Sequence, residues 1–245
     1  MNMKAKEMLR FLKLEYLLEY WDDVIVEAEK NNLSYDKFLF EIIKKEYAHR
    51  LEVTTTNRIK RAKIPNEFTI DTYPFNEQPH LNKKRLLQRC DSLDYLEKNR
   101  NIIFIGPTGT GKTGLASSIL RHGLNQGYCG HFVEFNTLME ELLSSMAARS
   151  TKKVIKKYAA YRCLVVDDLC YIEADKVGMG LFYSLIQKRY SKSCTIVTTA
   201  LGLAEWDTIF NNKQLTDGLL SRLTDNGHII NFKNCKNIRK DPEVD

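Results

Sequence analysis

One segment of the chain has the composition and spacing of a phosphate-binding loop. Residues 106–113 read Gly-Pro-Thr-Gly-Thr-Gly-Lys-Thr and fit the pattern G-x-x-x-x-G-K-[ST]. In such a loop backbone N–H groups converge on phosphate oxygens, the lysine reaches the terminal phosphates, and the last hydroxyl ligates Mg²⁺. The segment therefore predicts ATP and Mg²⁺ as cofactors. The predicted nucleotide-binding residues are Gly106, Pro107, Thr108, Gly109, Thr110, Gly111, Lys112 and Thr113.

Two adjacent aspartates supply the second half of such a site. A metal beside a phosphate-binding loop needs an acidic group at the end of a neighbouring buried strand, and Asp167 and Asp168 follow the apolar run 164–166. Asp167 comes 55 residues after Lys112, which leaves room for a helix, a strand and a second helix. We expect Thr113 and Asp167 to hold Mg²⁺, Asp167 through water, and Asp168 to polarise the attacking water.

Two later segments contain further candidates for catalysis. The run 195–200 is expected beside both motifs, where Thr198 and Thr199 are placed to touch the γ-phosphate or the attacking water. Packing of β-branched residues within a strand explains these threonines nearly as well. Arg222 lies near the end of a late helical window, and an arginine delivered to a neighbouring subunit can stabilise transition-state charge. A solvated arginine on a helix is the alternative.

The elements that must position these residues alternate between short apolar runs and helical windows. The apolar runs lack the alternation of half-exposed strands, so they indicate buried strands. Strands alternating with helices predict an α/β fold in which a parallel five-stranded sheet lies between helices. The predicted strands are 102–105, 131–135, 163–166, 195–198 and 229–232, and the helical windows are 115–122, 137–147, 177–190 and 214–223.

The chain divides into three parts by sequence pattern. Residues 1–63 have apolar side chains at steps of three and four, which predicts a small all-α N-terminal domain. Residues 64–99 carry three prolines in their first half, which indicates a linker packed on a domain surface. Residues 100–245 are expected to form the ATP-binding domain.

Composition narrows the class of protein. With 245 residues, 43% hydrophobic and 28% charged, the chain resembles ordinary globular proteins rather than disordered or collagen-like ones. The net charge of +6 is compatible with a polyanionic partner. Six scattered cysteines without a C-x-x-C pair argue against a zinc module or a disulfide scaffold. Because no run approaches the roughly 20 apolar residues that span a bilayer, we expect a cytoplasmic protein without a membrane partner.

Blocks spread over nearly the whole chain carry a resemblance to a known family. These blocks are residues 32–35 (Asn-Leu-Ser-Tyr), 38–39, the basic stretch before 64–65, 106–113, 164–169, 181–190, 205–206 (Glu-Trp) and 221–223 (Ser-Arg-Leu). Together they resemble the IstB-type transposition helper ATPases, which are AAA+ proteins close to the DnaC helicase loaders. The segment 106–113 is common to many ATPases, whereas the blocks 32–35 and 205–206 are more specific.

The resemblance implies an AAA+ core that assembles as a homo-oligomer on double-stranded DNA, with ATP at the subunit interfaces. It also implies that the protein engages the cognate transposase of an insertion sequence and stimulates its activity. Within that framework Arg222 is expected to act on the ATP of a neighbouring subunit. Relatives usually carry Asn where this chain has Ala200, so we expect Thr199 to substitute in catalysis or hydrolysis to be slow.

The resemblance also marks a basic segment as a helix that grips the DNA backbone. The four cations of this segment are Lys152, Lys153, Lys156 and Lys157. Their spacing of four residues within each pair puts them on one side of a helix, a useful pattern for phosphate contacts. A solvated helix face is the alternative interpretation.

Three other functions compete with the transposition helper. A replicative helicase loader of the same clade shares every nucleotide-binding residue and differs in the N-terminal partner-binding domain, where the block 33–35 favours the helper. A small-molecule kinase needs an arginine-rich lid after the third strand, whereas residues 172–175 there are acidic. An interaction protein with a degenerate site is disfavoured by the intact loop and by Asp167 and Asp168, although Ala200 keeps it open.

Overall fold

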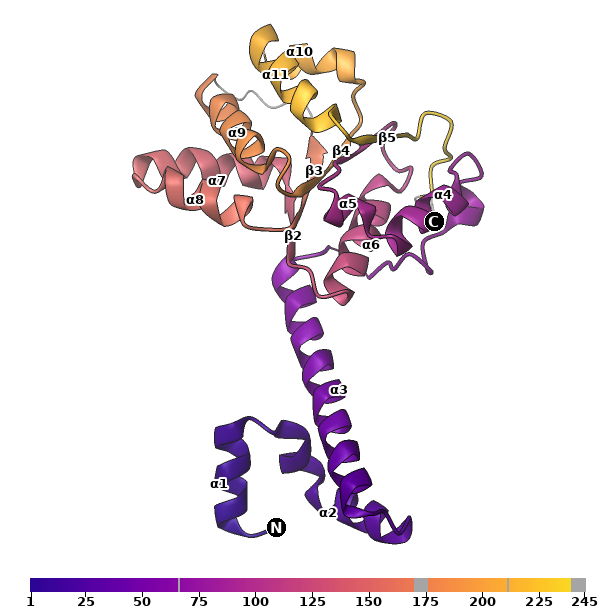
Figure 1. Ribbon diagram of the computed structural model, residues 1–245. Helices are drawn as coiled ribbons and strands as arrows, with labels where there is room; N and C mark the ends of the chain where they lie inside the picture. Colours follow the sequence, from indigo (N-terminus) through magenta and orange to yellow (C-terminus); the bar gives the residue numbers. More distant parts are fainter. Residues whose placement is uncertain (66, 170–175, 211, 239–245) are drawn as a thin grey trace, which may run out of the picture. The chain divides into compact units, whose positions relative to one another are not determined.

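The computed structural model of the protein describes residues 1–65, 67–169, 176–210 and 212–238 (Figure 1). The chain divides into two compact units, Met1–Arg58 and Ile59–Asp245. The acidic residues 172–175, which bear on the kinase alternative, lie outside the described residues.

The second unit is built on a five-stranded parallel sheet (Figure 1). Its strands are β1 (Ile102–Ile105), β2 (Gly130–Glu134), β3 (Cys163–Leu169), β4 (Cys194–Thr199) and β5 (His228–Asn231). Their order in the sheet is β2-β3-β4-β1-β5, and every neighbouring pair is parallel. The predicted parallel sheet is confirmed. Because all the strands run the same way, their carboxyl ends share one edge, where the predicted site residues gather.

Helices cover both faces of the sheet, since successive residues of a buried strand point to opposite sides. In β1, Ile102 and Phe104 belong to one apolar cluster and Ile103 to the other. The first cluster includes side chains of α4 (Lys83–Asp91), α5 (Asp94–Glu97) and α6 (Lys112–Asn125). The second includes α7 (Phe135–Ala147), α8 (Thr151–Ala159), α9 (Lys176–Arg189), α10 (Trp206–Phe210) and α11 (Lys213–Thr224), with the 3-10 helix η2 (Leu203–Glu205) before α10.

The N-terminal unit is entirely helical in its regular structure, as the apolar periodicity predicts. It contains α1 (Met3–Leu12), α2 (Glu15–Lys30) and most of α3 (Tyr35–Ala62). Its buried core is small and consists of Leu9, Leu17 and Val24. The two units meet along the chain between Arg58 and Ile59, inside α3 and a few residues before the predicted boundary at residue 63.

The segment 64–99, predicted as a linker, contributes to the core of the second unit. Besides α4 and α5 it contains the 3-10 helix η1 (Phe75–Glu77). Ile70, Tyr73, Phe75 and Leu81 are buried in the same cluster as α6. This packing places the aromatic part of the segment next to the start of α6, where the phosphate-binding loop ends.

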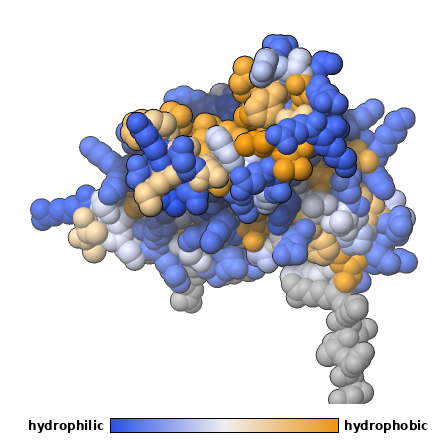
Figure 2. Space-filling model, turned by 90° about the horizontal axis from the view of Figure 1, so that it is seen from below, coloured by the Kyte–Doolittle hydropathy of each residue, from blue (hydrophilic) through white to orange (hydrophobic). Residues whose placement is uncertain are grey.

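The face of the molecule shown in Figure 2 is largely hydrophilic, with apolar side chains gathered in part of it. Most of the large apolar side chains that the structure leaves exposed belong to the N-terminal unit, among them Phe11, Phe40 and Tyr47. Among the described residues, no helix combines the length and the apolar composition that crossing a membrane requires.

Candidate nucleotide-binding site

The phosphate-binding loop connects β1 to α6 through backbone conformations that only glycine adopts easily. Gly109 has φ +79° and Gly111 has φ +90°. A Cβ added to Gly111 would lie 2.6 Å from the Tyr73 hydroxyl oxygen and 2.8 Å from Cδ1 of Ile238. Glycine is therefore required here both for the turn and for the close approach of neighbouring segments.

The loop ends at the N-terminus of α6, whose first backbone N–H groups have no partner within the helix and favour an anion. Lys112, the first residue of α6, folds back over the loop. Its Nζ donates to the carbonyl oxygens of Gly106 and Pro107, both at 2.7 Å. Lys112 also lines the cavity above the loop, so its ammonium lies where terminal phosphates would bind.

The cavity above the loop has a volume of about 530 Å³, which is within the range of roughly 300–1,000 Å³ typical of small-molecule sites. Of the predicted residues, the cavity is lined by Thr108, Gly109, Gly111, Lys112, Thr113, Asp167 and Asp168. Gly106, Pro107 and Thr110 do not line it. They support the loop instead, since the Thr110 hydroxyl donates to the Pro107 carbonyl oxygen at 2.8 Å.

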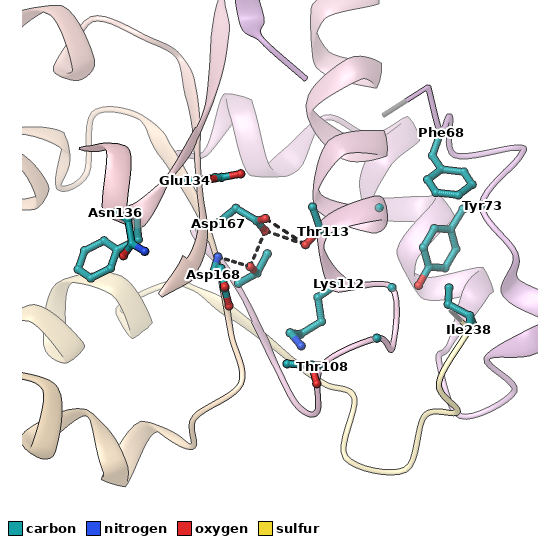
Figure 3. A pocket seen from close by; sticks show the side chains of 15 residues that line it. Phe68, Tyr73, Thr108, Lys112, Thr113, Glu134, Asn136, Asp167, Asp168 and Ile238 are labelled. Atoms are coloured by element: carbon teal, nitrogen blue, oxygen red, sulfur yellow. Dashed lines mark hydrogen bonds between the residues drawn. The ribbon is translucent and has the colours of Figure 1, made fainter. Parts of the chain in front are cut away.

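Thr113 and Asp167, the two residues predicted to hold the metal, are in direct contact (Figure 3). The Thr113 hydroxyl lies 3.0 Å from Oδ1 and 3.1 Å from Oδ2 of Asp167. Asp167 is 7% exposed, and burial raises the pKa of its carboxyl because the charged form is disfavoured away from water. A hydroxyl and a carboxylate at the edge of a phosphate cavity form a donor set that suits Mg²⁺.

Asp168 differs from Asp167 in its environment. It is exposed, it lines the cavity, and its φ of +55° is uncommon for a residue other than glycine. The pairing of β3 with β4 shifts register between Val166 and Leu169, at the same point. The register shift turns Asp168 out of the regular strand, which leaves its carboxylate open to the cavity while Asp167 stays buried.

The structure assigns the polar contact from β4 to Thr198 rather than to Thr199. The Thr198 hydroxyl donates to Oδ1 of Asp167 at 2.6 Å and accepts from the Asp168 N–H at 2.9 Å, and Thr198 lines the cavity. The Thr199 hydroxyl donates to the Leu169 carbonyl oxygen at 2.7 Å, and Thr199 does not line the cavity. Thr199, the threonine predicted to be catalytic, therefore does not face the cavity in this structure, because neighbouring residues of a strand face opposite sides.

Several residues of the cavity were missed by sequence reasoning. Glu134 and Asn136 come from the end of β2 and the start of α7, and they face the cavity from the side of the aspartates (Figure 3). Their position at the carboxyl edge of the sheet was a usable signal. Phe68, Tyr73 and Ile238 line the opposite side, and they come from segments that no motif marks.

Arg222 lies on α11, and it does not line the cavity of its own chain. Its guanidinium carbon is 4.9 Å from the ring centroid of Tyr183 and 6.0 Å from that of Tyr190. It also donates hydrogen bonds to the Gln187 side chain and, at 2.7 Å, to the Gly218 carbonyl oxygen. The structure therefore holds Arg222 on a partly exposed surface formed by α9 and α11.

The four lysines predicted to contact DNA lie on α8, where all four are exposed while Ile155 and Tyr158 face the core. Lys157 differs from the other three because its Nζ forms an ion pair with Glu141 at 2.7 Å. Within the described part of the chain, no ion pair involves Lys152, Lys153 or Lys156. Three of the four charges are thus not neutralised by the protein itself.

Comparison with known families matches these features to one family along almost the entire chain. The model of the IstB-like ATP binding proteins matches residues 7–242. The chain belongs to this family. As an IstB-like protein it binds ATP and is classed as an ATPase, and the resemblance predicted from its sequence blocks is confirmed.

Relatives of similar length come from insertion sequences. The ATP-binding protein of insertion sequence IS232 from Bacillus thuringiensis subsp. berliner is 29% identical, over 91% of this chain and 89% of the relative. The ATP-binding protein of insertion sequence IS5376 from Geobacillus stearothermophilus is 28% identical, over 95% and 92%. The IstB-like chain therefore matches these proteins over nearly their full lengths.

Solved structures show the same AAA+ fold. The DnaC helicase loader has a TM-score of 0.54 at 22% identity, covering 66% of this chain and 95% of the loader. DnaA from Aquifex aeolicus, bound to AMPPCP, has a TM-score of 0.58 at 15% identity, covering 70% and 51%. At these identities the likeness establishes the fold and nothing finer, so the predicted AAA+ architecture is confirmed.

Proposed function

We propose that this IstB-like protein is an ATP-dependent DNA-binding helper of an insertion-sequence transposase. In this proposal it assembles as a homo-oligomer on double-stranded DNA, with ATP at the subunit interfaces, and stimulates transposition. The contact among Thr113, Asp167 and Thr198 at the mouth of an intact phosphate-binding loop carries the proposal. It is the arrangement that a hydrolysing site needs, and it occurs in a chain that matches insertion-sequence proteins over nearly their full lengths.

Each residue of the site has a distinct task in the proposed hydrolysis. Lys112 and the N–H groups at the start of α6 bind the phosphates. Thr113 and Asp167 would hold Mg²⁺, which when bound neutralises charge on the β- and γ-phosphates. Asp168, open to the cavity, orients the attacking water, and Thr198 fixes the positions of both aspartates.

The subunit interface is proposed to complete the site through Arg222. Its position outside its own cavity, on a partly exposed surface, supports a role on the ATP of the neighbouring subunit. An arginine supplied in this way stabilises the charge that develops on the transferred phosphoryl group. Assembly and hydrolysis are then coupled, because neither subunit alone has a complete site.

The DNA contact is proposed to lie on α8. Lys152, Lys153 and Lys156 present unneutralised charge on an exposed helix, which supports binding to phosphates without base readout. The transposase is proposed to bind the N-terminal unit, where exposed Phe11, Phe40 and Tyr47 offer apolar area that a protein partner would cover. The alternative of a helicase loader is supported by the shared nucleotide-binding residues and by the likeness in fold to the DnaC helicase loader.

Oligomer size and ATP turnover, measured with and without duplex DNA and with the transposase encoded beside the gene, test the proposal. We expect duplex DNA with ATP to drive assembly of the wild-type protein and the transposase to bind the assembled form. Lys112→Ala is expected to lose ATP binding and assembly together. A wild-type protein that captures replicative helicase in place of the transposase, or that stays monomeric on DNA with ATP, contradicts the proposed function.

A further inference from the structure

The side chain of Gln78 joins three segments next to the phosphate-binding loop. Gln78 is 1% exposed, and its Nε2 donates to the carbonyl oxygens of Thr110 at 2.9 Å and of Lys236 at 2.6 Å. Its Oε1 accepts from the N–H of Lys236 at 2.9 Å. A buried amide with its donors and its acceptor paired holds its partners in one geometry. Gln78 therefore ties the loop to the segment 233–238, which we call the tail.

The tail runs along the loop itself. The N–H of Ile238 donates to the Gly109 carbonyl oxygen at 2.9 Å. A Cβ added to Gly109 would lie 2.3 Å from Oδ1 of Asn237, so the Asn237 side chain lies directly against the loop. The Ile238 side chain reaches the cavity. The tail is thus a wall of the nucleotide cavity and not only a continuation of β5.

Three apolar side chains form this wall. Phe68 and Tyr73 pack edge to face with ring centroids 6.5 Å apart, and Ile238 lies beside them. Figure 3 shows all three on one side of the loop, across from Asp167 and Thr113. A cavity with charged groups at one end and rings at the other matches a nucleoside triphosphate, whose phosphates are charged and whose base is flat and apolar on its faces.

Among the described residues of this wall, Tyr73 carries a buried polar group that a bound ligand could pair. Tyr73 is 3% exposed, and its hydroxyl oxygen has no hydrogen-bond partner among the residues that the structure describes. Burial raises the pKa of Tyr73, so the hydroxyl keeps its proton and remains a donor. A buried hydroxyl without a partner is costly, unless a ligand supplies the acceptor.

We propose that Tyr73, Phe68 and the tail form the nucleoside-binding wall of the ATP site. In this arrangement the rings and Ile238 cover the base, and the Tyr73 hydroxyl donates to an oxygen or nitrogen acceptor of the bound nucleoside. Gln78 does not line the cavity, so it acts as a positioning residue that fixes the tail against the loop. The inference rests on the proposed nucleotide site and adds the group that recognises the nucleoside end.

The contribution of this wall can be distinguished from that of the phosphate site by comparing two ligands that share the phosphate chain, only one of which has a nucleoside. Calorimetric titrations of the full chain with ATP and with inorganic tripolyphosphate, both with Mg²⁺, are compared for the wild type, Tyr73→Phe, Gln78→Met and Ile238→Ala. Tyr73→Phe is expected to weaken ATP binding by about 3- to 10-fold, the value of one hydrogen bond, and to leave tripolyphosphate binding unchanged. Gln78→Met and Ile238→Ala are likewise expected to weaken ATP binding and to leave tripolyphosphate binding unchanged.

The matched control is Tyr128→Phe, the same change at a partly buried tyrosine of the same apolar cluster that does not line the cavity. It should leave both affinities unchanged. The assignment of the nucleoside-binding wall is overturned if Tyr73→Phe leaves ATP affinity unchanged. It is also overturned if all three variants lose affinity equally for ATP and for tripolyphosphate. Lys112→Ala tests the phosphate end separately, because it should weaken both ligands. Wild-type affinities in that variant contradict the nucleotide site itself.

Discussion

The hydroxyl of Thr113, at the start of α6, lies 3.0 and 3.1 Å from the two carboxylate oxygens of Asp167, on β3, although 54 residues separate them along the chain. Thr198 approaches the same carboxylate from β4. The buried carboxylate of Asp167 therefore connects β3, which carries it, to the start of α6 and to β4.

Asp167→Asn should stabilise the protein without nucleotide and abolish the Mg²⁺-dependent part of ATP binding. Burial raises the pKa of Asp167 above its usual 3.8, so the stability this group contributes is present below pH 3.8 and is lost as pH rises through the raised value. At pH 7 the buried charge of the Asp167 carboxylate therefore lowers the free energy of unfolding, and the neutral amide of Asn removes this destabilisation. Thermal unfolding should show a higher midpoint, by about 2–4 °C for each kcal/mol regained.

The control for this variant is Asp168→Asn, because Asp168 is exposed and its charge costs little in the folded state. Its unfolding midpoint should match that of the wild type while ATP hydrolysis falls. A lower midpoint for Asp167→Asn than for the wild type would contradict the assignment of Asp167 as a destabilised metal ligand.

Thr198→Val should lower activity, whereas Thr199→Val should lower stability and spare activity. Thr198→Val removes the hydroxyl between Asp167 and the Asp168 N–H, so kcat for ATP hydrolysis should fall by about 10-fold or more. Thr199→Val removes two hydrogen bonds, one donated to the Leu169 carbonyl oxygen and one accepted from the Leu201 N–H, so it should cost about 1–3 kcal/mol of unfolding free energy and leave kcat near that of the wild type. Equal losses of kcat in both variants would return Thr199 to the catalytic site.

Replacing Lys152, Lys153 and Lys156 by Gln should weaken duplex binding irrespective of sequence. The slope of log K against log salt concentration should become shallower by about 0.9 for each phosphate that the variant no longer neutralises. Lys157→Gln is the matched control on the same helix, because the ion pair with Glu141 already neutralises its charge. Titrations of labelled duplex at several salt concentrations measure both effects, and a triple variant with the wild-type slope assigns these lysines to a solvated face.

Arg222→Ala should spare ATP affinity and lower ATPase activity by about 10³-fold or more, if the arginine acts on the ATP of a neighbour. Its contacts with Tyr183 and Gln187 lie away from the cavity, so nucleotide binding has no reason to change. Subunit mixing is decisive. Arg222→Ala and Asp168→Asn subunits, each low in activity alone, should regain activity when mixed, since some interfaces then combine an intact Asp168 with an intact arginine. No recovery would exclude action in trans.

The N-terminal helices, the parallel sheet and the phosphate-binding loop could all be predicted from the sequence. Residues 106–113 are contiguous, so a single short motif predicts phosphate binding, and the glycine positions specify the turn. Asp167 could be predicted because a buried apolar strand that ends in an acid is also a local pattern. Parallel pairing then brings the ends of such strands to one edge, whatever the details of packing.

Tertiary structure decided which side chains face the cavity at that edge of the sheet. Thr198 and Thr199 are equivalent in sequence, and only the pairing of β4 with β3 decides which hydroxyl meets Asp167. Tyr73 lies 38 residues before Gly111, and Gln78 lies 158 residues before Lys236. No local sequence pattern therefore predicts the contact of Tyr73 with Gly111 or that of Gln78 with Lys236. Such approaches depend on how buried segments pack around the loop, which is a property of the whole core and not of any one motif.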